Sequence, residues 1–136
     1  MKILDVMSSV PTTVFVDDDL DVALRTMLLA DIRHLPVLAG GKLAGILSQG
    51  DVLRARAIAG GRRLRVSDAM TAPVETVAPG DDVSSAAVRM ATLRIGCVVV
   101  VDEGDLVGIV TALDLLAQIG LQAEAAVSIG DIGGES

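Results

Sequence analysis

Two aspartates, each three residues after a hydroxyl, are the strongest candidates for chemistry in this sequence. Ser48 and Asp51 form one such pair, Thr111 and Asp114 form the other, and each pair follows a glycine and two apolar residues. A hydroxyl that opens a helix can accept a hydrogen bond from a free backbone N–H, and that helix end attracts phosphate. An ionised carboxylate only accepts hydrogen bonds, which suits the two donors of a ribose diol. Together these groups could hold a nucleotide by its sugar and phosphates.

The same spacing is also that of a helix-capping box. For a single copy, the cap would be the simpler interpretation. Two copies with the same glycine-apolar-apolar approach favour a binding site. The two interpretations are compatible, because a capping side chain can also contact a ligand.

The motif is part of a repeat that runs through most of the chain. Residues 45–51 return as residues 108–114, at an offset of 63 positions. The same offset relates Asp5 to Asp68 and Met27 to Met90. The chain is therefore one unit written twice. We expect a first repeat over residues 1–62, a second over 63–120, and a C-terminal extension over 121–136 that is loose at its end.

Apolar periodicity and turn residues predict the elements that position the motifs. In the first copy they are a short helix over 3–7, a strand over 12–16, a helix over 20–30, a hairpin over 33–47 and a helix over 48–59. In the second copy they are a short helix over 66–70, a strand over 74–77, a helix from 83, a hairpin over 97–110 and a helix over 111–119.

Glycines and one proline predict where these elements end or break. Gly60 and Gly61 should end the first closing helix and Gly120 the second, although residues 121–127 could extend it. Pro36 predicts a sheet edge or a break in the strand ladder.

The repeated motif, the segment from His34 to Val37 and the 63-residue offset resemble a known family. From about Ile3 to about Ile119, the chain is similar to a stand-alone tandem pair of cystathionine-β-synthase (CBS) domains, called a Bateman module. The resemblance implies an α/β (α+β) fold in which each repeat is β-α-β-β-α. The two repeats would pack through their small sheets with pseudo-twofold symmetry and enclose two ligand sites. Two modules would form a homodimer.

The resemblance also implies which positions line the nucleotide sites. Asp51 and Asp114 would hold ribose hydroxyls, and Ser48 and Thr111 would face phosphate. The remaining positions that match the nucleotide-binding strands of the family are Val10, Pro11, Thr13, Arg33, His34, Pro36, Thr76 and Val77.

The two sites should not bind alike. Arg33 and His34 would add basic groups at the start of a strand, whereas Gly96 and Cys97 replace them in the second copy. A lone histidine beside an apolar run can also be an ordinary half-buried side chain. We interpret Cys97 as a small core residue rather than a nucleophile, because no histidine lies near it in sequence.

Composition excludes several classes of protein. The net charge of −7 opposes nucleic-acid binding, despite the basic segment 62–65, which we interpret as a solvated linker. One cysteine and one histidine cannot build a structural zinc site, and residues 17–19 indicate a helix N-terminus rather than a metal site. No stretch predicts a membrane span or signal peptide, and the single cysteine fits the cytoplasm.

Together with these observations, the resemblance to CBS pairs implies a regulatory module without catalytic activity of its own. Its ligand would be AMP, ADP, ATP or S-adenosylmethionine, with Mg²⁺ accompanying ATP, and its protein target would be bound in trans. The alternative is a ligand-free dimerisation or docking module. A catalytic role is opposed by the single histidine, which leaves little acid–base capacity near neutral pH.

Overall fold

The computed structural model describes residues 1–9 and 12–133. Its helices are α1 (Ile3–Val6), α2 (Leu20–Ala30), α3 (Gln49–Ala59), α4 (Val66–Ala69), α5 (Val83–Leu93) and α6 (Ala112–Gly133). Its strands are β1 (Ser8–Ser9), β2 (Val14–Phe15), β3 (His34–Ala39), β4 (Lys42–Ser48), β5 (Thr76–Val77), β6 (Cys97–Asp102) and β7 (Asp105–Thr111).

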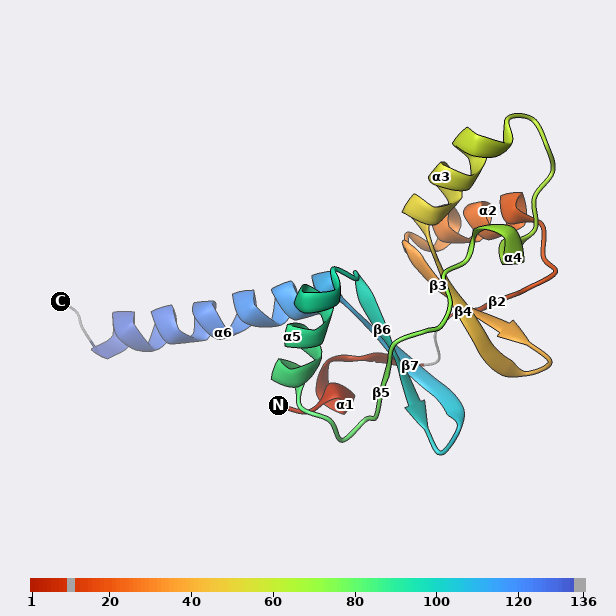
Figure 1. Cartoon of the computed structure of the whole chain (residues 1–136). Helices are drawn as coiled ribbons and strands as arrows, with labels where there is room; N and C mark the ends of the chain where they lie inside the picture. The colour runs from red at the N-terminus through yellow and green to blue at the C-terminus, as the bar shows by residue number, and fades with distance from the viewer. Residues whose placement is uncertain (10–11, 134–136) are drawn as a thin grey trace.

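The strands form two small sheets, one in each lobe of the molecule (Figure 1). The first has the order β2-β3-β4 and the second the order β1-β7-β6-β5. In each, an antiparallel hairpin is extended by a two-residue parallel strand. The predicted mixed α+β fold with two small sheets is therefore confirmed.

Each lobe has its own aliphatic core. In α2, Leu20, Ala23 and Met27 are buried at helical spacing, and in α5 Ala86 and Met90 take the equivalent places. These stripes pack on the apolar faces of the hairpins, which supply most of the remaining buried side chains. The sequence predicts apolar stripes at helical spacing that also include Leu28 and Ala91; the central positions do face the cores, but Leu28 and Ala91 are exposed.

The two repeats exchange their leading segments. Ile3 of α1 is fully buried in the core of the second repeat, and β1 pairs with β7. Conversely, Val66 of α4 is fully buried in the core of the first repeat, and Thr71 bridges to Ile46 in β4. Figure 1 shows α1 beside α5 and β5, and α4 beside α2 and α3. Neither lobe can complete its core from one sequence copy alone.

This exchange explains the glycine that opens each motif. A Cβ atom on Gly108 would lie 2.6 Å from Met7 Sδ and 2.9 Å from the backbone oxygen of Ser8. A Cβ atom on Gly45 would similarly meet Met70 at 2.7 Å and the Thr71 oxygen at 3.0 Å. The crossing segment lies so close to the hairpin that only glycine leaves room for it.

The prediction that Gly120 ends the last helix is wrong, because α6 continues through it to Gly133. One glycine costs a helix only about 1 kcal/mol, and the leucine, glutamine, glutamate and alanines that follow are strong helix formers. In the first copy Gly60 does end α3, with a positive φ of 65°. Residues 134–136, the end of the extension that the sequence predicts to be loose, lie outside the described residues.

Pro36 lies in a central strand and not at a sheet edge, but it does break the strand ladder. It does not lie at an edge, since β3 is the central strand of its sheet. The ladder does break there, because pairing with β2 begins only at Val37. In the second copy the equivalent Val99 N–H donates to Glu75 O at 3.1 Å, a bond that proline cannot make.

Adding one methyl group at the crossing should destabilise the whole pair. We expect Gly108→Ala to lower the free energy of unfolding by about 1–3 kcal/mol, because the backbone of the crossing segment must shift. Gly120→Ala is the matched control, since a Cβ there meets nothing within 4 Å, and it should leave stability unchanged or raise it by up to about 1 kcal/mol. Urea unfolding followed by circular dichroism measures both. Equal stability of the two variants would contradict the role assigned to the crossing.

Candidate ligand-binding site

A capping box opens the closing helix of each repeat. In the first, Asp51 N–H donates to Ser48 Oγ at 3.0 Å, and Ser48 N–H donates to Asp51 Oδ2 at 2.9 Å. In the second, Asp114 N–H donates to Thr111 Oγ1 at 3.2 Å, and Thr111 N–H donates to Asp114 Oδ2 at 2.8 Å. The capping interpretation is therefore confirmed for both copies. Each cap uses one carboxylate oxygen and leaves Oδ1 for another partner.

The first strand of each hairpin, β3 or β6, is fixed at its start by the closing helix. Gln49 N–H donates to Arg33 O, and Ala112 N–H donates to Gly96 O, both at 2.9 Å. These bonds join the first residue of a closing helix to the loop before β3 or β6. The residues at 33–34 and 96–97 are thereby held beside the two helix N-termini.

A cavity of about 580 Å³ lies between the repeats beside Asp114. It is lined by residues of both repeats, which are Ser8, Ser9, Thr12, Asp31, Ile32, Arg33, His34, Gly96, Ile109, Thr111, Ala112, Leu113 and Asp114. Small-molecule sites typically measure about 300–1,000 Å³, so the volume suits a nucleoside-sized ligand. Hydroxyls, one carboxylate cap and basic groups line a single cavity.

Four of the site residues that the sequence singles out meet in this cavity, namely Thr111, Asp114, Arg33 and His34. Among the described residues, Asp114 Oδ1 accepts no hydrogen bond and Arg33 has no ion-pair partner. The cavity therefore presents an available acceptor and an available cation on opposite repeats. Ser48 and Asp51 form the equivalent cap but do not line this cavity.

Sequence reasoning missed three hydroxyl residues of the cavity, Ser8, Ser9 and Thr12. The first two reach it because β1 crosses to pair with β7. The only sequence signal for this was the glycine of the motif, whose close approach to another backbone a sequence alone does not reveal. Thr12 adjoins the predicted Thr13, which is half-buried and lies outside the lining.

The other predicted strand positions lie elsewhere. Pro36 is buried within β3, Thr76 is exposed on β5, and Val77 is buried in the second core. Val10 and Pro11 fall outside the described residues. The described strand positions contribute to the sheets and the second core rather than to the cavity lining.

His34 is half-buried against the second repeat. A Cβ atom on Gly96 would lie 3.0 Å from His34 Nε2, so glycine at this position makes room for the imidazole. Burial lowers the pKa of His34 below its ordinary value, although the Asp51 carboxylate acts in the opposite direction and Arg33 adds to the lowering. The ring is therefore mainly neutral at pH 7 and can donate from one nitrogen and accept at the other.

Cys97 is buried at the start of β6, as the sequence predicts for a core residue. Burial raises the pKa of its thiol to about 12, and the nearby Asp51 charge adds to the effect. Because the thiolate is the reactive form, the side chain is inert near neutral pH.

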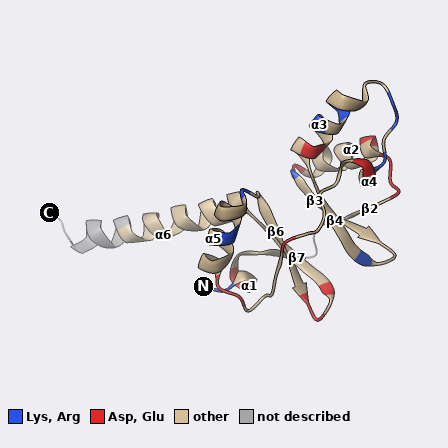
Figure 2. Cartoon of the chain, viewed as in Figure 1, with Lys and Arg blue, Asp and Glu red and all other residues tan. Residues whose placement is uncertain are grey.

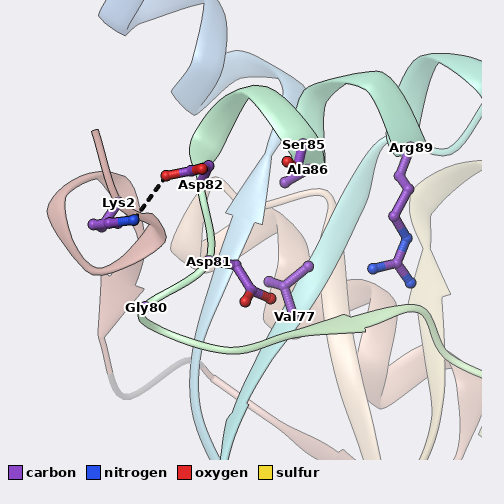
Figure 3. Close-up of a pocket in the computed structure, with 8 residues that line it drawn as sticks. All are labelled: Lys2, Val77, Gly80, Asp81, Asp82, Ser85, Ala86 and Arg89. Carbon is purple, nitrogen blue, oxygen red and sulfur yellow. Dashed lines mark hydrogen bonds and ion pairs between the residues drawn. The ribbon is translucent and has the colours of Figure 1, made fainter.

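A second, smaller pocket of about 270 Å³ lies where α1 meets α5 (Figure 3). Lys2 Nζ lies 2.8 Å from Asp82 Oδ1 across it, and both side chains are largely exposed. Arg89, on its other side, pairs with Glu75. Exposed pairs of this kind contribute little, and the pocket shares no lining residue with the cavity. This pocket is the space that remains between α1, which comes from the first repeat, and α5 of the second repeat.

The acidic and basic clusters of the sequence largely neutralise each other. Asp19 caps α2 by accepting from Asp21 N–H at 2.8 Å. Arg63 pairs with Asp19, and Arg65 with Asp17. Figure 2 shows the blue positions of the segment between α3 and α4 on the same side of the lobe as the red positions between β2 and α2. No three histidine, cysteine or acidic side chains of the described chain converge where they could hold a metal ion. Nor does any helix within residues 1–9 and 12–133 have the length and apolarity needed to cross a membrane.

Solved structures with this arrangement are known. The AcuB protein of Vibrio cholerae matches with a TM-score of 0.82 and 32% identity, over 94% of this chain and 96% of its own. The CBS domain pair of protein MJ0100, solved with 5′-methylthioadenosine and S-adenosyl-L-methionine, matches with a TM-score of 0.82 and 29% identity, over 90% of this chain and 98% of its own.

A longer relative also contains the same region. Homoserine O-acetyltransferase from Methanohalophilus mahii is 32% identical over 118 residues, which are 85% of this chain and 24% of the relative. The chain thus spans about a quarter of the length of this curated relative. The family model for the CBS domain matches residues 3–58 and again residues 66–120. This chain therefore belongs to the CBS domain family, as a tandem pair of CBS repeats.

Proposed function

We propose that this chain is a regulatory module that binds an adenosine-containing ligand in the cavity beside Asp114. The observation that carries the proposal is the cavity itself, where both repeats bring an available carboxylate oxygen, hydroxyls and basic groups together. The CBS pair of MJ0100, which has the same fold at 29% identity, is solved with two adenosine-containing ligands. The longer acetyltransferase relative shares only this region with the chain, about a quarter of its own length.

Asp31 also lines the cavity and would repel an anionic group of the ligand, whereas the other polar groups each have a distinct task in this proposal. Asp114 Oδ1 accepts from the ribose diol, since Oδ2 is already held by the cap. Thr111 and the N-terminus of α6 face an anionic group of the ligand. Arg33 and His34 approach the same group from the other repeat. The hydroxyls of Ser8, Ser9 and Thr12 complete the polar lining.

The candidate ligands differ in charge, which makes them distinguishable. AMP, ADP and ATP carry phosphates that Arg33 would attract, and ATP would bring Mg²⁺ with it. S-adenosylmethionine carries no phosphate; it has a sulfonium and an ammonium, which Arg33 would repel, and a single carboxylate, which Arg33 would attract. A ligand that contacts both repeats favours the conformations in which they lie close together, so binding would shift their relative orientation. This shift would be the signal to a protein target in trans.

A homodimer is part of the proposal. The chain exposes 8310 Å², whereas a compact monomer of 13.9 kDa exposes roughly 6,700 Å². The surplus of about 1,600 Å² exceeds the roughly 800 Å² that each partner buries in a standard interface. Most exposed large apolar side chains lie on four helices, namely Val22, Leu28 and Leu29 of α2, Leu53 and Ile58 of α3, Val88 and Leu93 of α5, and Leu113, Leu116, Ile119 and Leu121 of α6. We propose that a second copy covers them.

The alternative function is a docking module that binds no small molecule. The exposed helices support it as well as they support the dimer. The available acceptor on Asp114 favours the ligand-binding module, because a purely structural cap would not need a cavity beside it.

Removing the charge of Asp114 should weaken ligand binding. Calorimetric titration with AMP, ADP, ATP and S-adenosylmethionine should identify one preferred ligand, and Asp114→Asn should weaken it roughly tenfold to hundredfold, because a charge-assisted hydrogen bond is lost. Asp68→Asn is the matched control, since Asp68 holds the same capping position in α4 but does not line the cavity. If Asp114→Asn binds like the wild type, the ligand has been placed wrongly, and if no ligand binds a folded wild type, the docking module is correct.

Affinity for a phosphate ligand should rise with acidity through His34. Burial keeps the His34 pKa low in the free protein, and a bound phosphate would raise it, so binding takes up a proton. Affinity should therefore increase as pH falls from about 8 towards the lowered free-state pKa, which lies below about 6.5. Comparing wild type with His34→Gln removes the titration of the phosphate itself. Identical pH profiles for the two proteins would show that His34 does not meet the phosphate.

Charges on the exposed helices should break the dimer. Leu116→Lys combined with Ile119→Lys should convert a dimer into a monomer in light scattering after size exclusion, because burying two ammonium groups is costly. Phe15→Lys is the control, since Phe15 is similarly exposed but lies on β2, in the other lobe from α6 (Figure 1). A monomeric wild type would contradict the proposed homodimer.

A further inference from the structure

The carboxylate of Asp51 is fully engaged within its own repeat. Its Oδ2 accepts from Ser48 N–H, and its Oδ1 accepts from Arg54 Nη2 at 2.7 Å. Thr71 Oγ1 lies 3.5 Å from both oxygens. The side chain of Asp51 is only 9% exposed. The acceptor that a ribose diol would need is therefore already taken by a guanidinium.

Gly50 provides the space that this guanidinium occupies. A Cβ atom on Gly50 would lie 3.4 Å from Arg54 Nη1 and 3.9 Å from Arg54 Cζ. The head of Arg54 therefore folds back over the first turn of α3, across the helix N-terminus. These are ordinary van der Waals distances, so a methyl group at position 50 would fit, whereas a longer side chain would compete for this volume.

The second repeat has the opposite arrangement at the same two positions. By the offset of 63, Leu113 corresponds to Gly50, and Ala117 corresponds to Arg54. Leu113 is 65% exposed and lines the cavity, and Ala117 is too short to reach Asp114. Asp114 Oδ1 thus stays available and lines the cavity. The two sites therefore differ at both positions in opposite directions. The first repeat has a short residue followed by a long one, and the second has a long residue followed by a short one.

The guanidinium resembles the part of a ligand that the carboxylate would bind. It presents N–H donors to a carboxylate as a ribose diol presents O–H donors, and its bond is charge-assisted and therefore stronger than one from a neutral hydroxyl. A cation over a helix N-terminus is normally unfavourable, so the Asp51 charge is what holds Arg54 there. Because 71% of the Arg54 side chain is exposed, removing it would open the site without disturbing a core.

We propose that Arg54 occupies the ribose position at Asp51 and closes the first site, so that the chain binds one ligand at Asp114. This inference rests on the proposed function, since it assigns the ligand to one of two equivalent caps. It makes Arg54 a specificity-determining residue and Asp51 a structural cap with an internal partner.

Binding stoichiometry tests the inference. We use AMP and S-adenosylmethionine as probes in calorimetry. The wild type should bind one probe molecule per chain, and the Asp51→Asn variant should bind it with the same affinity as the wild type. Arg54→Ala, which matches Ala117, should bind a second molecule per chain. Arg56→Ala is the matched control, because Arg56 lies on the same helix but pairs with Asp21, and it should still bind one. The reciprocal variant Leu113→Gly with Ala117→Arg should weaken the remaining site about tenfold or more.

Other outcomes separate this inference from the proposed function. Two molecules bound per wild-type chain, or one bound by a folded Arg54→Ala variant, would overturn the closure while leaving ligand binding intact. Weaker binding by Arg54→Ala at the single site would overturn it too, because Arg54 would then contact the ligand. If neither probe binds the wild type, the proposed function fails. In that case, binding of a probe by Arg54→Ala would still support the closure of the first site by Arg54. Absence of binding by Arg54→Ala would overturn the closure as well.

Discussion

The architecture depends on a backbone crossing at two glycines. The leading segment of each repeat passes over the hairpin of the other at Gly45 or Gly108, so closely that a methyl group would lie within 3 Å of it. The crossing completes both cores, through Ile3 in one lobe and Val66 in the other. Units of about sixty residues bury too little surface to be stable alone. Because the crossing also brings β1 to the cavity, folding of the pair and assembly of the candidate site are one event.

The capping boxes show how one carboxylate can serve structure and binding together. A helix that starts at a strand end must satisfy its free N–H groups, and each aspartate does so through Oδ2. The second oxygen is then held rigidly at the helix N-terminus without being used by the cap. What differs between the repeats is the next contact of that oxygen. It is a guanidinium at Asp51, whereas at Asp114 the same oxygen lines an open cavity.

The first repeat places two large basic side chains beside glycines. The imidazole of His34 lies against Gly96, and the guanidinium of Arg54 lies against Gly50. Only the first contact is tight, since a Cβ atom on Gly96 would lie 3.0 Å from His34 Nε2, whereas one on Gly50 would lie at an ordinary 3.4 Å from Arg54 Nη1. The basic groups of the first repeat therefore serve two different sites. Arg33 and His34 line the cavity beside Asp114, whereas Arg54 contacts Asp51 in its own repeat.

The sequence by itself determined the repeat, the helical stripes, the two hairpins and both capping boxes, because these depend on local spacing and on residues a few positions apart. It also identified Asp114, Thr111, Arg33 and His34 as site candidates. Only the tertiary structure decided which segments cross between repeats, and hence that Ser8, Ser9 and Thr12 line the cavity. It also decided that Asp51 and Asp114 have different partners, since the reach of Arg54 depends on the space over Gly50. Such contacts depend on how two backbones approach in space, and a one-dimensional pattern carries no measure of that distance.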